Sequence, residues 1–315
     1  MIKLVCFSII ALAVCLAYSN FSIAVCVQGP PTTFTCNTNP PNPDLDGIRE
    51  DINPDDLIVN VLPGAGVDTT AVGGDAIRTG NGMDIVDVDG GDIDSDEDGI
   101  DTSTNQDQVT VKDSTITAGE DGIDTSTNKD TVTVINSTIT AVEEGIDTST
   151  NMDIVTVTDS TVKSSTKEAI ETSTNIDQVT IINSIIMAPT DAIQLGTNDD
   201  TITLGTGADI RGLINCDQDS GDTSLLDTII FAMDVPEEAL PFISSQIAAA
   251  TVPDGSVTIN GLFYEWINCN ILENQLNGVR NVRPIPTLSE WGLIAMAGAL
   301  GVFGTIYMAR RRQTA

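Results

Sequence analysis

One short acidic stretch has the residue types and the spacing of a cation-binding loop. In DSDEDG, the three carboxylates Asp94, Asp96 and Asp98 alternate with other residues and are followed by Gly99. Alternate carboxylates can converge on one hard cation such as Ca²⁺, while the glycine permits a sharp turn. The glutamate that usually closes such a loop is absent, because Asn105 occupies its position. We expect calcium at this loop, with a solvated acidic turn as the alternative.

Other carboxylates recur along the chain at a nearly constant spacing. Side chains stacked about 5 Å apart with like charge repel one another, so each row needs cations, hydrogen bonds from backbone N–H groups, or water. Aspartate at a turn readily accepts such hydrogen bonds, so we favour a structural role, with cation bridging as the alternative. One row contains Asp84, Asp107, Asp130, Asp153, Asp177 and Asp200; a second contains Asp101, Asp124, Asp147 and Glu171; a second acidic loop contains Asp217, Asp219 and Asp222.

The overall charge excludes several classes of partner. The chain has 46 acidic and 13 basic residues, no histidine, and a formal net charge of −33. Nucleic acids and anionic lipid surfaces require clustered Lys and Arg, so neither is an expected partner. The absence of histidine excludes Ser-His and Cys-His nucleophilic centres. We therefore expect that the protein is not an enzyme. From the acidic loop described above, we expect Ca²⁺ as its cofactor.

A seven-residue phrase that recurs along the chain reveals the architecture. GIDTSTN begins at Gly99, Gly122 and Gly145, and looser copies begin at Ala169 and Ala192. The repeat unit is 23 or 24 residues long, a period that is typical of solenoids. Because equivalent positions recur so regularly, each unit should form one coil that packs only on its neighbours.

Within each unit, β-branched and polar residues alternate with a period of two, which favours strands over helices. Short runs broken by Gly and Asn predict three strands per coil. The sequence thus predicts an all-β fold, a right-handed parallel β-helix, and not a leucine-rich horseshoe. The expected inward rows are Val86, Val109, Val132, Val155, Val179 and Ile202; Val88, Val111, Val134, Val157, Ile181 and Leu204; and Ile93, Ile116, Ile139, Val162 and Ile186.

The two ends of the chain carry targeting signals. Residues 1–24 have a short basic start, an apolar run and a small-x-small cleavage site, as in a secretory signal peptide. Near the other end, an apolar stretch of about transmembrane length is followed by arginines, which predicts a C-terminal transmembrane helix with the preceding chain outside. The residues that carry this pattern are Ile285, Pro286, Thr287, Leu288, Trp291, Gly292, Arg310, Arg311 and Arg312.

These C-terminal residues resemble the IPTL-CTERM sorting signal, which is itself similar to the PEP-CTERM signals of Gram-negative envelope proteins. The resemblance implies export through the inner membrane, insertion of the C-terminal helix in that membrane, and a sorting transpeptidase of the exosortase type as a partner. It implies a final location in the cell envelope, at the surface or outside the cell. Only the last part of the chain carries the resemblance, so it concerns delivery.

Export places the cysteines in an oxidising compartment. After removal of the signal peptide, Cys26, Cys36, Cys216 and Cys269 remain. Four cysteines allow three connectivities, of which Cys26–Cys36 with Cys216–Cys269 is the simplest. The expected organisation is a signal peptide (1–24), an N-terminal lead-in and cap (25–70), β-helix repeats (71–235), a C-terminal cap (236–283) and the sorting signal (284–315).

Two further residue sets bear on function. Outward threonines, including Thr110, Thr133 and Thr156, form ranks that resemble those of β-helical ice-binding proteins, although threonine is also a good exposed strand residue. The aromatic residues of the C-terminal region are expected to cap the open end of the core; they are Phe242, Phe263, Tyr264 and Trp266.

These patterns favour an exported surface β-solenoid with a structural or adhesive role that contacts a glycan or matrix ligand. The first alternative is a polysaccharide-active enzyme, because parallel β-helices include pectate lyases. Such enzymes need a cluster of unlike groups at one place, whereas the acids here repeat in every unit. An ice-binding surface protein is the second alternative.

Overall fold

The computed structural model describes residues 26–29, 32–37, 44–45, 47–49, 56–216, 227–250, 252–269 and 271–279. The predicted signal peptide (1–24) and sorting segment (284–315) lie outside these residues, as does the second acidic loop (217–222). Within the described ranges, no helix combines the length and the apolar character that crossing a membrane would require.

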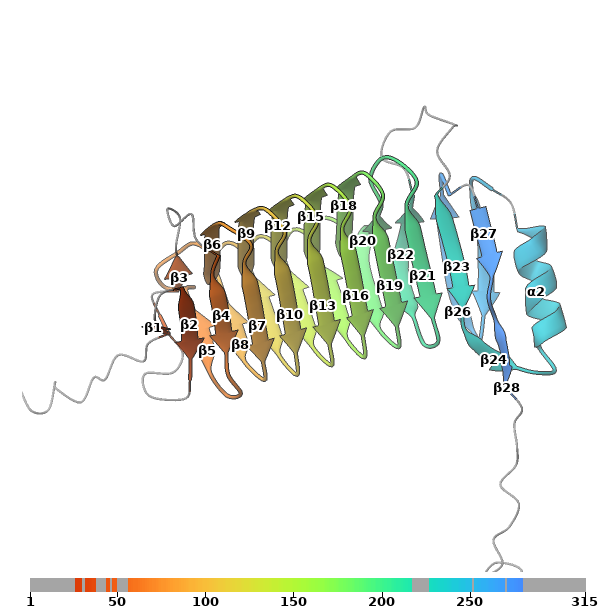
Figure 1. The fold of residues 1–315 in the computed structure, drawn as a ribbon. Coiled ribbons are helices and arrows are strands. Elements are labelled where there is room, and N and C mark those ends of the chain that lie inside the picture. Colours follow the sequence, from red (N-terminus) through yellow and green to blue (C-terminus); the bar gives the residue numbers. More distant parts are fainter. Residues whose placement is uncertain are drawn as a thin grey trace, which may run out of the picture.

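Each repeat forms one coil of three short strands, and the coils stack side by side into an elongated solenoid (Figure 1). One coil contains β10 (Gln108–Lys112), β11 (Thr115–Ala118) and β12 (Ile123–Thr127). Each pairs in parallel, without a register shift, with its equivalent in the next coil. Those partners are β13 (Thr131–Ile135), β14 (Thr138–Ala141) and β15 (Ile146–Thr150). The predicted parallel β-solenoid with coils of about 23 residues is confirmed.

One face of the solenoid is a sheet of 11 strands, parallel apart from the antiparallel pair β1–β2. Its strands, in spatial order, are β1 (Val27–Gly29), β2 (Thr33–Cys36), β4 (Ile58–Val61), β7 (Ile85–Asp89), β10, β13, β16 (Ile154–Thr158), β19 (Gln178–Ile182), β21 (Thr201–Gly205), β23 (Thr228–Ala232) and β27 (Ile271–Asn274).

The other two faces belong to a single sheet of 15 strands, because β20 (Ile185–Gln194) runs from one face to the other. On one side of β20 lie β3 (Ile48–Arg49), β6 (Ile77–Asn81), β9 (Ile100–Thr104), β12, β15 and β18 (Ile170–Thr174). On the other side lie β5 (Gly66–Asp68), β8 (Asp92–Asp94), β11, β14 and β17 (Thr161–Ser164). Strands β22 (Asp209–Asn215), β25 (Gly255–Ile259) and β26 (Leu262–Ile267) complete this sheet.

The core consists of apolar rows that run along the solenoid axis. Every residue of the three predicted inward rows is at most 1 % exposed. A fourth row is equally buried and contains the isoleucines that follow the Gly or Ala at the start of each repeated phrase, together with Ile77 one coil earlier: Ile77, Ile100, Ile123, Ile146, Ile170 and Ile193. Burying each such side chain contributes about 1.5–3 kcal/mol, so the stacked rows are the main source of stability.

The turns explain the recurring asparagines. Asn105, Asn128, Asn151, Asn175 and Asn198 all have φ between 90° and 103°. Asparagine tolerates this left-handed region better than most residues, which is why it recurs where each coil turns. At another corner, serines form a ladder: the N–H of Ser114 donates to Oγ of Ser137 (3.1 Å), and the N–H of Ser137 donates to Oγ of Ser160 (3.0 Å).

The C-terminal end of the solenoid is covered by a different structure. The antiparallel hairpin β25–β26, the helix α2 (Leu240–Ala249) and the two-stranded sheet of β24 (Asp234–Pro236) and β28 (Asn277–Val279) close it. Tyr264 and Trp266 are buried and pack against Phe231 with ring centroids 5.8 Å and 6.2 Å away. Disulfides join Cys26 to Cys36 and Cys216 to Cys269.

The expected capping role of the aromatic residues is correct for two of them and wrong for the other two. Phe242 is 66 % exposed and Phe263 is 56 % exposed. Strand β26 alternates between core and solvent, so Tyr264 and Trp266 face inward while Phe263 and Glu265 face outward.

Candidate functional site

The first carboxylate row forms a buried ladder at one corner of the coil. The N–H of Asp84 donates to Oδ1 of Asp107 (2.7 Å), and the N–H of Asp107 donates to Oδ1 of Asp130 (2.8 Å). The same bond joins Asp130 to Asp153, Asp153 to Asp177, Asp177 to Asp200 and Asp200 to Asp227. All seven aspartates are at most 2 % exposed. The predicted hydrogen bonds to backbone N–H groups are therefore present, and this row is structural.

The second oxygen of each carboxyl group in this ladder faces the interior. Thr79, Thr125, Thr148 and Thr172 are equally buried, and each lowers the pKa of the aspartate that follows it in the same coil through its hydroxyl group. Desolvation by burial outweighs this effect. The pKa rises to about 7 for Asp107, about 6 for Asp130 and about 8 for Asp200. A seam of oxygen atoms thus runs inside the otherwise apolar solenoid.

A second pair of acidic rows lies at another corner and is more accessible to solvent. At this corner the hydrogen bonds run in the opposite direction along the axis: the N–H of Asp121 donates to Oδ1 of Asp98 (2.9 Å), and the N–H of Glu144 donates to Oδ1 of Asp121 (2.8 Å). Three residues further along the chain, Asp101, Asp124 and Asp147 stack in register on the outer face of β9, β12 and β15. We call the two rows together the acidic double row; its members are Asp75, Asp98, Asp121, Glu144 and Glu168 with Asp101, Asp124, Asp147 and Glu171.

This double row contains the carboxylate groups that could hold a metal ion. In the part of the chain that the structure describes, the triads with ligand oxygens within 4.8 Å of one another are Asp75, Asp98 and Asp101; Asp121, Glu143 and Glu144; and Glu144, Glu168 and Glu171. Burial, followed by the charge of neighbouring acids, raises the pKa of Asp124 to about 7 and that of Asp147 to about 8. Both effects favour the protonated, uncharged form of these two carboxyl groups.

Two basic side chains neutralise the acidic double row in part. Arg78 lies at its beginning, with Nη1 3.3 Å from Asp75 and Nε 3.2 Å from Asp101. Further along, the ammonium group of Lys167 lies 2.6 Å from Glu143 and 3.0 Å from Glu144. Between these two positions lie Asp124 and Asp147, whose carboxylates make no hydrogen bond or ion pair to the described residues.

Of the three residues predicted to bind calcium, the structure brings only Asp98 into a carboxylate group. Asp94 ends strand β8, in register with Asp68 and Thr117 of the adjacent coils. Asp96 lies in the following bend and is exposed. The carboxylates that approach Asp98 come from Asp75, one coil earlier, and from Asp101, rather than from its own acidic stretch.

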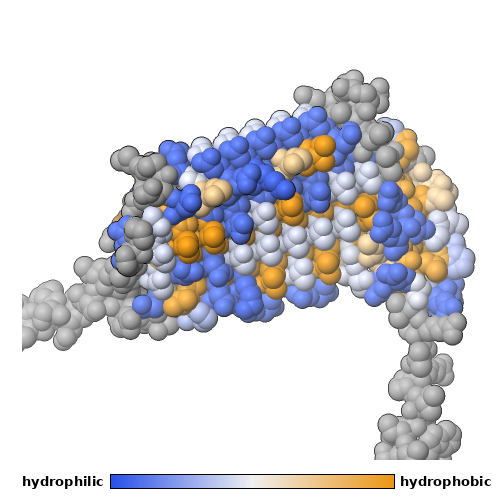
Figure 2. Space-filling view, viewed as in Figure 1, coloured by the Kyte–Doolittle hydropathy of each residue, from blue (hydrophilic) through white to orange (hydrophobic). Residues whose placement is uncertain are grey.

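The 11-stranded sheet presents a contrasting face. On β13, β16, β19 and β21 every outward residue is uncharged, and Thr133, Thr156, Thr180 and Thr203 form a continuous rank. Figure 2 shows pale and hydrophobic side chains gathered over these strands, with hydrophilic ones over the turns above and below. An uncharged face of this size is notable on a chain with a net charge of −33.

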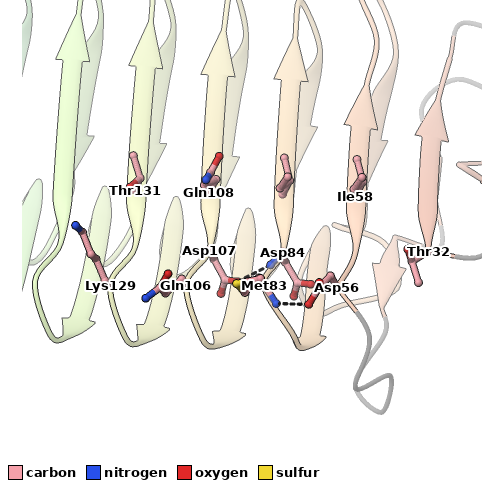
Figure 3. A pocket seen from close by; sticks show the side chains of 11 residues that line it. Thr32, Asp56, Ile58, Met83, Asp84, Gln106, Asp107, Gln108, Lys129 and Thr131 are labelled. Carbon is pink, nitrogen blue, oxygen red and sulfur yellow. Dashed lines mark hydrogen bonds between the residues drawn. The ribbon is translucent and has the colours of Figure 1, made fainter.

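A groove of about 520 Å³ runs across several coils beside the buried ladder (Figure 3). Asp56, Asp84, Gln106, Asp107 and Lys129 are among the residues that line it. Its carboxylates already accept backbone hydrogen bonds: Asp56 from Met83 (2.9 Å) and Asp84 from Leu57 (2.7 Å). These acids hold the turns in place and give the groove a polar lining.

Residues 283–312 match the family model of the IPTL-CTERM motif. The chain carries an IPTL-CTERM motif. The matched range includes every predicted sorting residue from Ile285 to Arg312. No curated protein and no solved structure matches this chain.

The IPTL-CTERM motif indicates an exported protein of the cell envelope or surface, with a partner that processes the chain or anchors it in a membrane. The motif lies outside the described residues and follows the solenoid in the sequence. It concerns delivery, and the role of the delivered domain depends on the solenoid.

Proposed function

We propose that this protein is an exported surface β-solenoid with a structural or adhesive role, and that calcium bound along the acidic double row stiffens it. The sorting motif supports the location. The ladders support the structural role, because side-chain oxygens at all three corners accept backbone hydrogen bonds from a neighbouring coil. A solenoid held in this way at every corner resists bending and fraying between coils.

We also propose that the uncharged threonine-rich face makes the adhesive contact. A surface with a large net negative charge is repelled by most cell surfaces and acidic polymers. The outer face of β13, β16, β19 and β21 avoids this repulsion and offers hydroxyl and methyl groups in regular ranks. Such a surface suits a neutral glycan or matrix ligand.

The single observation that carries the calcium proposal is the stacking of Asp101, Asp124 and Asp147 in register. Neighbouring carboxylates in such a stack lie about 5 Å apart, so one Ca²⁺ can be shared between two coils at ordinary oxygen-ligand distances. The ion would remove the repulsion between neighbouring carboxylates, which adds to burial in raising the pKa of Asp124 and Asp147. Lys167 provides a comparison within the molecule, because its ammonium group already bridges Glu143 and Glu144.

The experiment is a set of thermal melts of the purified full-length protein in EDTA, in Ca²⁺ and in Mg²⁺. We expect Ca²⁺ to raise Tm by several degrees, and Mg²⁺ to raise it less because Mg²⁺ keeps its water ligands. The double variant Asp124→Asn with Asp147→Asn should melt at the same temperature in EDTA and in Ca²⁺. An unchanged Tm of the wild-type protein on adding Ca²⁺ would contradict the proposal.

A matched control separates the two candidate calcium sites. Asp94→Asn with Asp96→Asn removes the same number of charges from the predicted loop and leaves the central stretch of the double row intact. We expect this variant to keep the response of the wild-type protein to Ca²⁺. If it loses the response while the Asp124 and Asp147 variant keeps it, the cation binds at the linear acidic loop instead.

We propose a non-catalytic role, because the same polar ladders recur from coil to coil, whereas a catalytic centre needs unlike groups gathered at one place. The alternative is a polysaccharide-active enzyme of the pectate lyase type. Incubation with polygalacturonate and Ca²⁺, followed by ultraviolet absorbance of unsaturated products, tests it. Turnover above that of a heat-denatured sample would favour the enzyme.

A further inference from the structure

The regular stacking of the solenoid is broken at one described position on the 15-stranded sheet, where β20 pairs with β22. The register between these strands shifts twice, between Met187 and Asp191 and again between Asp191 and Ile193. Gly212 of β22 has a φ of 150°, and a Cβ at this position would lie 2.8 Å from the carbonyl oxygen of Thr190. Only glycine fits at this position. The two register shifts form a bulge in the strand pair, and a hollow in the surface lies beside it.

The second wall of this hollow comes from the C-terminal hairpin. Asn260 and Gly261, both with positive φ, form the tight turn that joins β25 to β26. Immediately after the turn, Phe263 and Glu265 point outward from the same face of β26. Strands β22 and β26 pair near their ends, at Ile214 with Trp266. The resulting pocket has a volume of about 670 Å³, within the usual range for small-molecule sites.

The pocket combines groups that occur together nowhere else on the solenoid faces described above. Phe263 provides an aromatic ring that is 56 % exposed. Arg211 donates from Nε (2.9 Å) and Nη2 (2.7 Å) to Oδ2 of Asp209, which fixes its guanidinium plane. The carboxylate of Glu265 makes no hydrogen bond to the described residues. The β26 wall of the pocket therefore presents an aromatic ring and a carboxylate, and the β22 wall presents the paired Arg211 and Asp209.

We propose that this pocket, which we call the Phe263 pocket, binds one ring of a neutral sugar. Charge disfavours an anion, which would meet Glu265 on a chain with a net charge of −33. The Arg211–Asp209 pair carries no net charge, and a neutral sugar differs from a cation in that its hydroxyl groups can both donate to Glu265 and accept from the guanidinium of Arg211. A wholly apolar ligand would take water away from the carboxylate of Glu265 without replacing its hydrogen bonds, at a cost of about 1–3 kcal/mol.

A pyranose matches both sides of the pocket. The axial C–H bonds of a β-linked glucose or galactose form an apolar surface. This surface can lie flat on the electron-rich face of the Phe263 ring. Neighbouring hydroxyl groups can donate to the carboxylate of Glu265 and accept from the guanidinium of Arg211, and hydrogen bonds to charged groups are stronger than those between neutral ones. This inference goes beyond the proposed function, because the pocket lies on β22 and β26 of the 15-stranded sheet and adds a second glycan contact, apart from the threonine-rich face of the 11-stranded sheet.

The experiment is saturation-transfer NMR and titration calorimetry of the full-length protein with methyl β-D-glucopyranoside, methyl β-D-galactopyranoside and cellotriose, all in EDTA. We expect at least one of these probes to bind, with the strongest transfer to ring C–H protons. Phe263→Ala should weaken binding by about tenfold or more, and Phe263→Trp should retain it. Glu265→Gln keeps the shape of the side chain and should weaken binding by a smaller factor, because it removes the charge from the acceptor.

Phe242→Ala is the matched control, because Phe242 of α2 is 66 % exposed and does not line this pocket. It should leave the affinity unchanged. Equal losses in both phenylalanine variants, or none in Phe263→Ala, would overturn the inference. It would also be overturned if trigalacturonate bound and the neutral probes did not. The sugar measurements are made in EDTA and so do not depend on calcium. If no sugar binds while Ca²⁺ still raises Tm in the separate thermal melts, the sugar site alone is overturned and the proposed structural role stands.

Discussion

The backbone N–H of Asp107 donates a 2.8 Å hydrogen bond to Oδ1 of Asp130, its equivalent in the next coil. Each carboxyl group of the ladder is thus bound from one side by a neighbouring coil and is at the same time buried among other carboxyl groups. Burial and like charge both favour the protonated acid. The ladder should therefore take up protons when the chain folds.

The first prediction is that the protein is more stable at pH 5 than at pH 8. Desolvation raises the pKa of Asp107 and Asp153 to about 7 and that of Asp130 to about 6, whereas an unfolded chain keeps aspartate near about 3.9. Raised values mean that this stability is fully present below about pH 4 and is lost progressively as the pH rises from there through the folded pKa values of about 6 to about 7. Urea unfolding in EDTA at several pH values measures it. A free energy of unfolding that increases from pH 5 to pH 8 would show that the ladder does not bind protons in this way.

A second prediction assigns this pH dependence to one carboxyl group. Asp130→Asn keeps an oxygen that accepts the N–H of Asp107 but has no charge. At pH 8 this variant should be more stable than the wild-type protein, and at pH 5 it should lie within about 1 kcal/mol of it. Asp130→Ala removes the acceptor as well, so it should lose about 1–3 kcal/mol at both pH values. The same urea series compares all three proteins, and an Asn variant that is as damaging as the Ala variant would contradict the argument.

A third prediction concerns the glycine that opens the repeated phrase. A Cβ on Gly145 would lie 2.5 Å from the carbonyl oxygen of Ala169 and 2.5 Å from Cγ1 of Val162. Both atoms belong to packed parts of the solenoid, so neither can move away easily. Gly145→Ala should cost at least about 2 kcal/mol. Ala169→Gly, at the equivalent position in the next coil, removes only one methyl group and should cost about 1 kcal/mol. Thermal melts of the two variants test the difference, and similar Tm values would contradict it.

The fold could be predicted from the sequence because its main determinant is periodic. A single coil contains only a few inward residues, but Val109, Val132 and Val155 recur at one register and so report the same position several times. The alternation of apolar and polar residues then assigns the faces. The predicted inward rows were confirmed for this reason.

The same alternation contained information on the polar seam that the prediction did not use. Counting back from the inward Val109, Gln108 points outward and Asp107 inward, and Thr102 points inward because Ile100 does. Both positions are buried although their side chains are polar, as this alternation requires. Phe263 is the opposite case, an apolar side chain at an outward position. Tyr264 and Trp266 occupy the inward positions of β26, so the alternation leaves Phe263 exposed.

The candidate cation site could not be located from a linear motif. Asp94, Asp96 and Asp98 are close in sequence, but Asp94 ends a strand and the other two lie in the loop that follows it, so their carboxylates do not form one group. The groups that meet are Asp75, Asp98 and Asp101, which come from two coils. Contacts between coils depend on the register of stacking, and a motif read along one coil does not contain that information.

The last prediction concerns the disulfide between Cys216 and Cys269, which joins the end of β22 to the end of β26 and closes a sequence separation of 53 residues. Replacing both cysteines by serine should cost about 3–4 kcal/mol, since a cross-link of this length restricts the unfolded chain strongly. The loss should begin in the C-terminal cap, where Trp266 is fully buried and reports opening through a red shift of its fluorescence.

The pair Cys26–Cys36, with a separation of 10, closes a shorter loop, so its double serine variant should lose less. Chemical unfolding followed by tryptophan fluorescence compares the two variants. The prediction fails if the Cys216 and Cys269 variant is as stable as the wild-type protein, or if the N-terminal variant shifts the tryptophan transition by more.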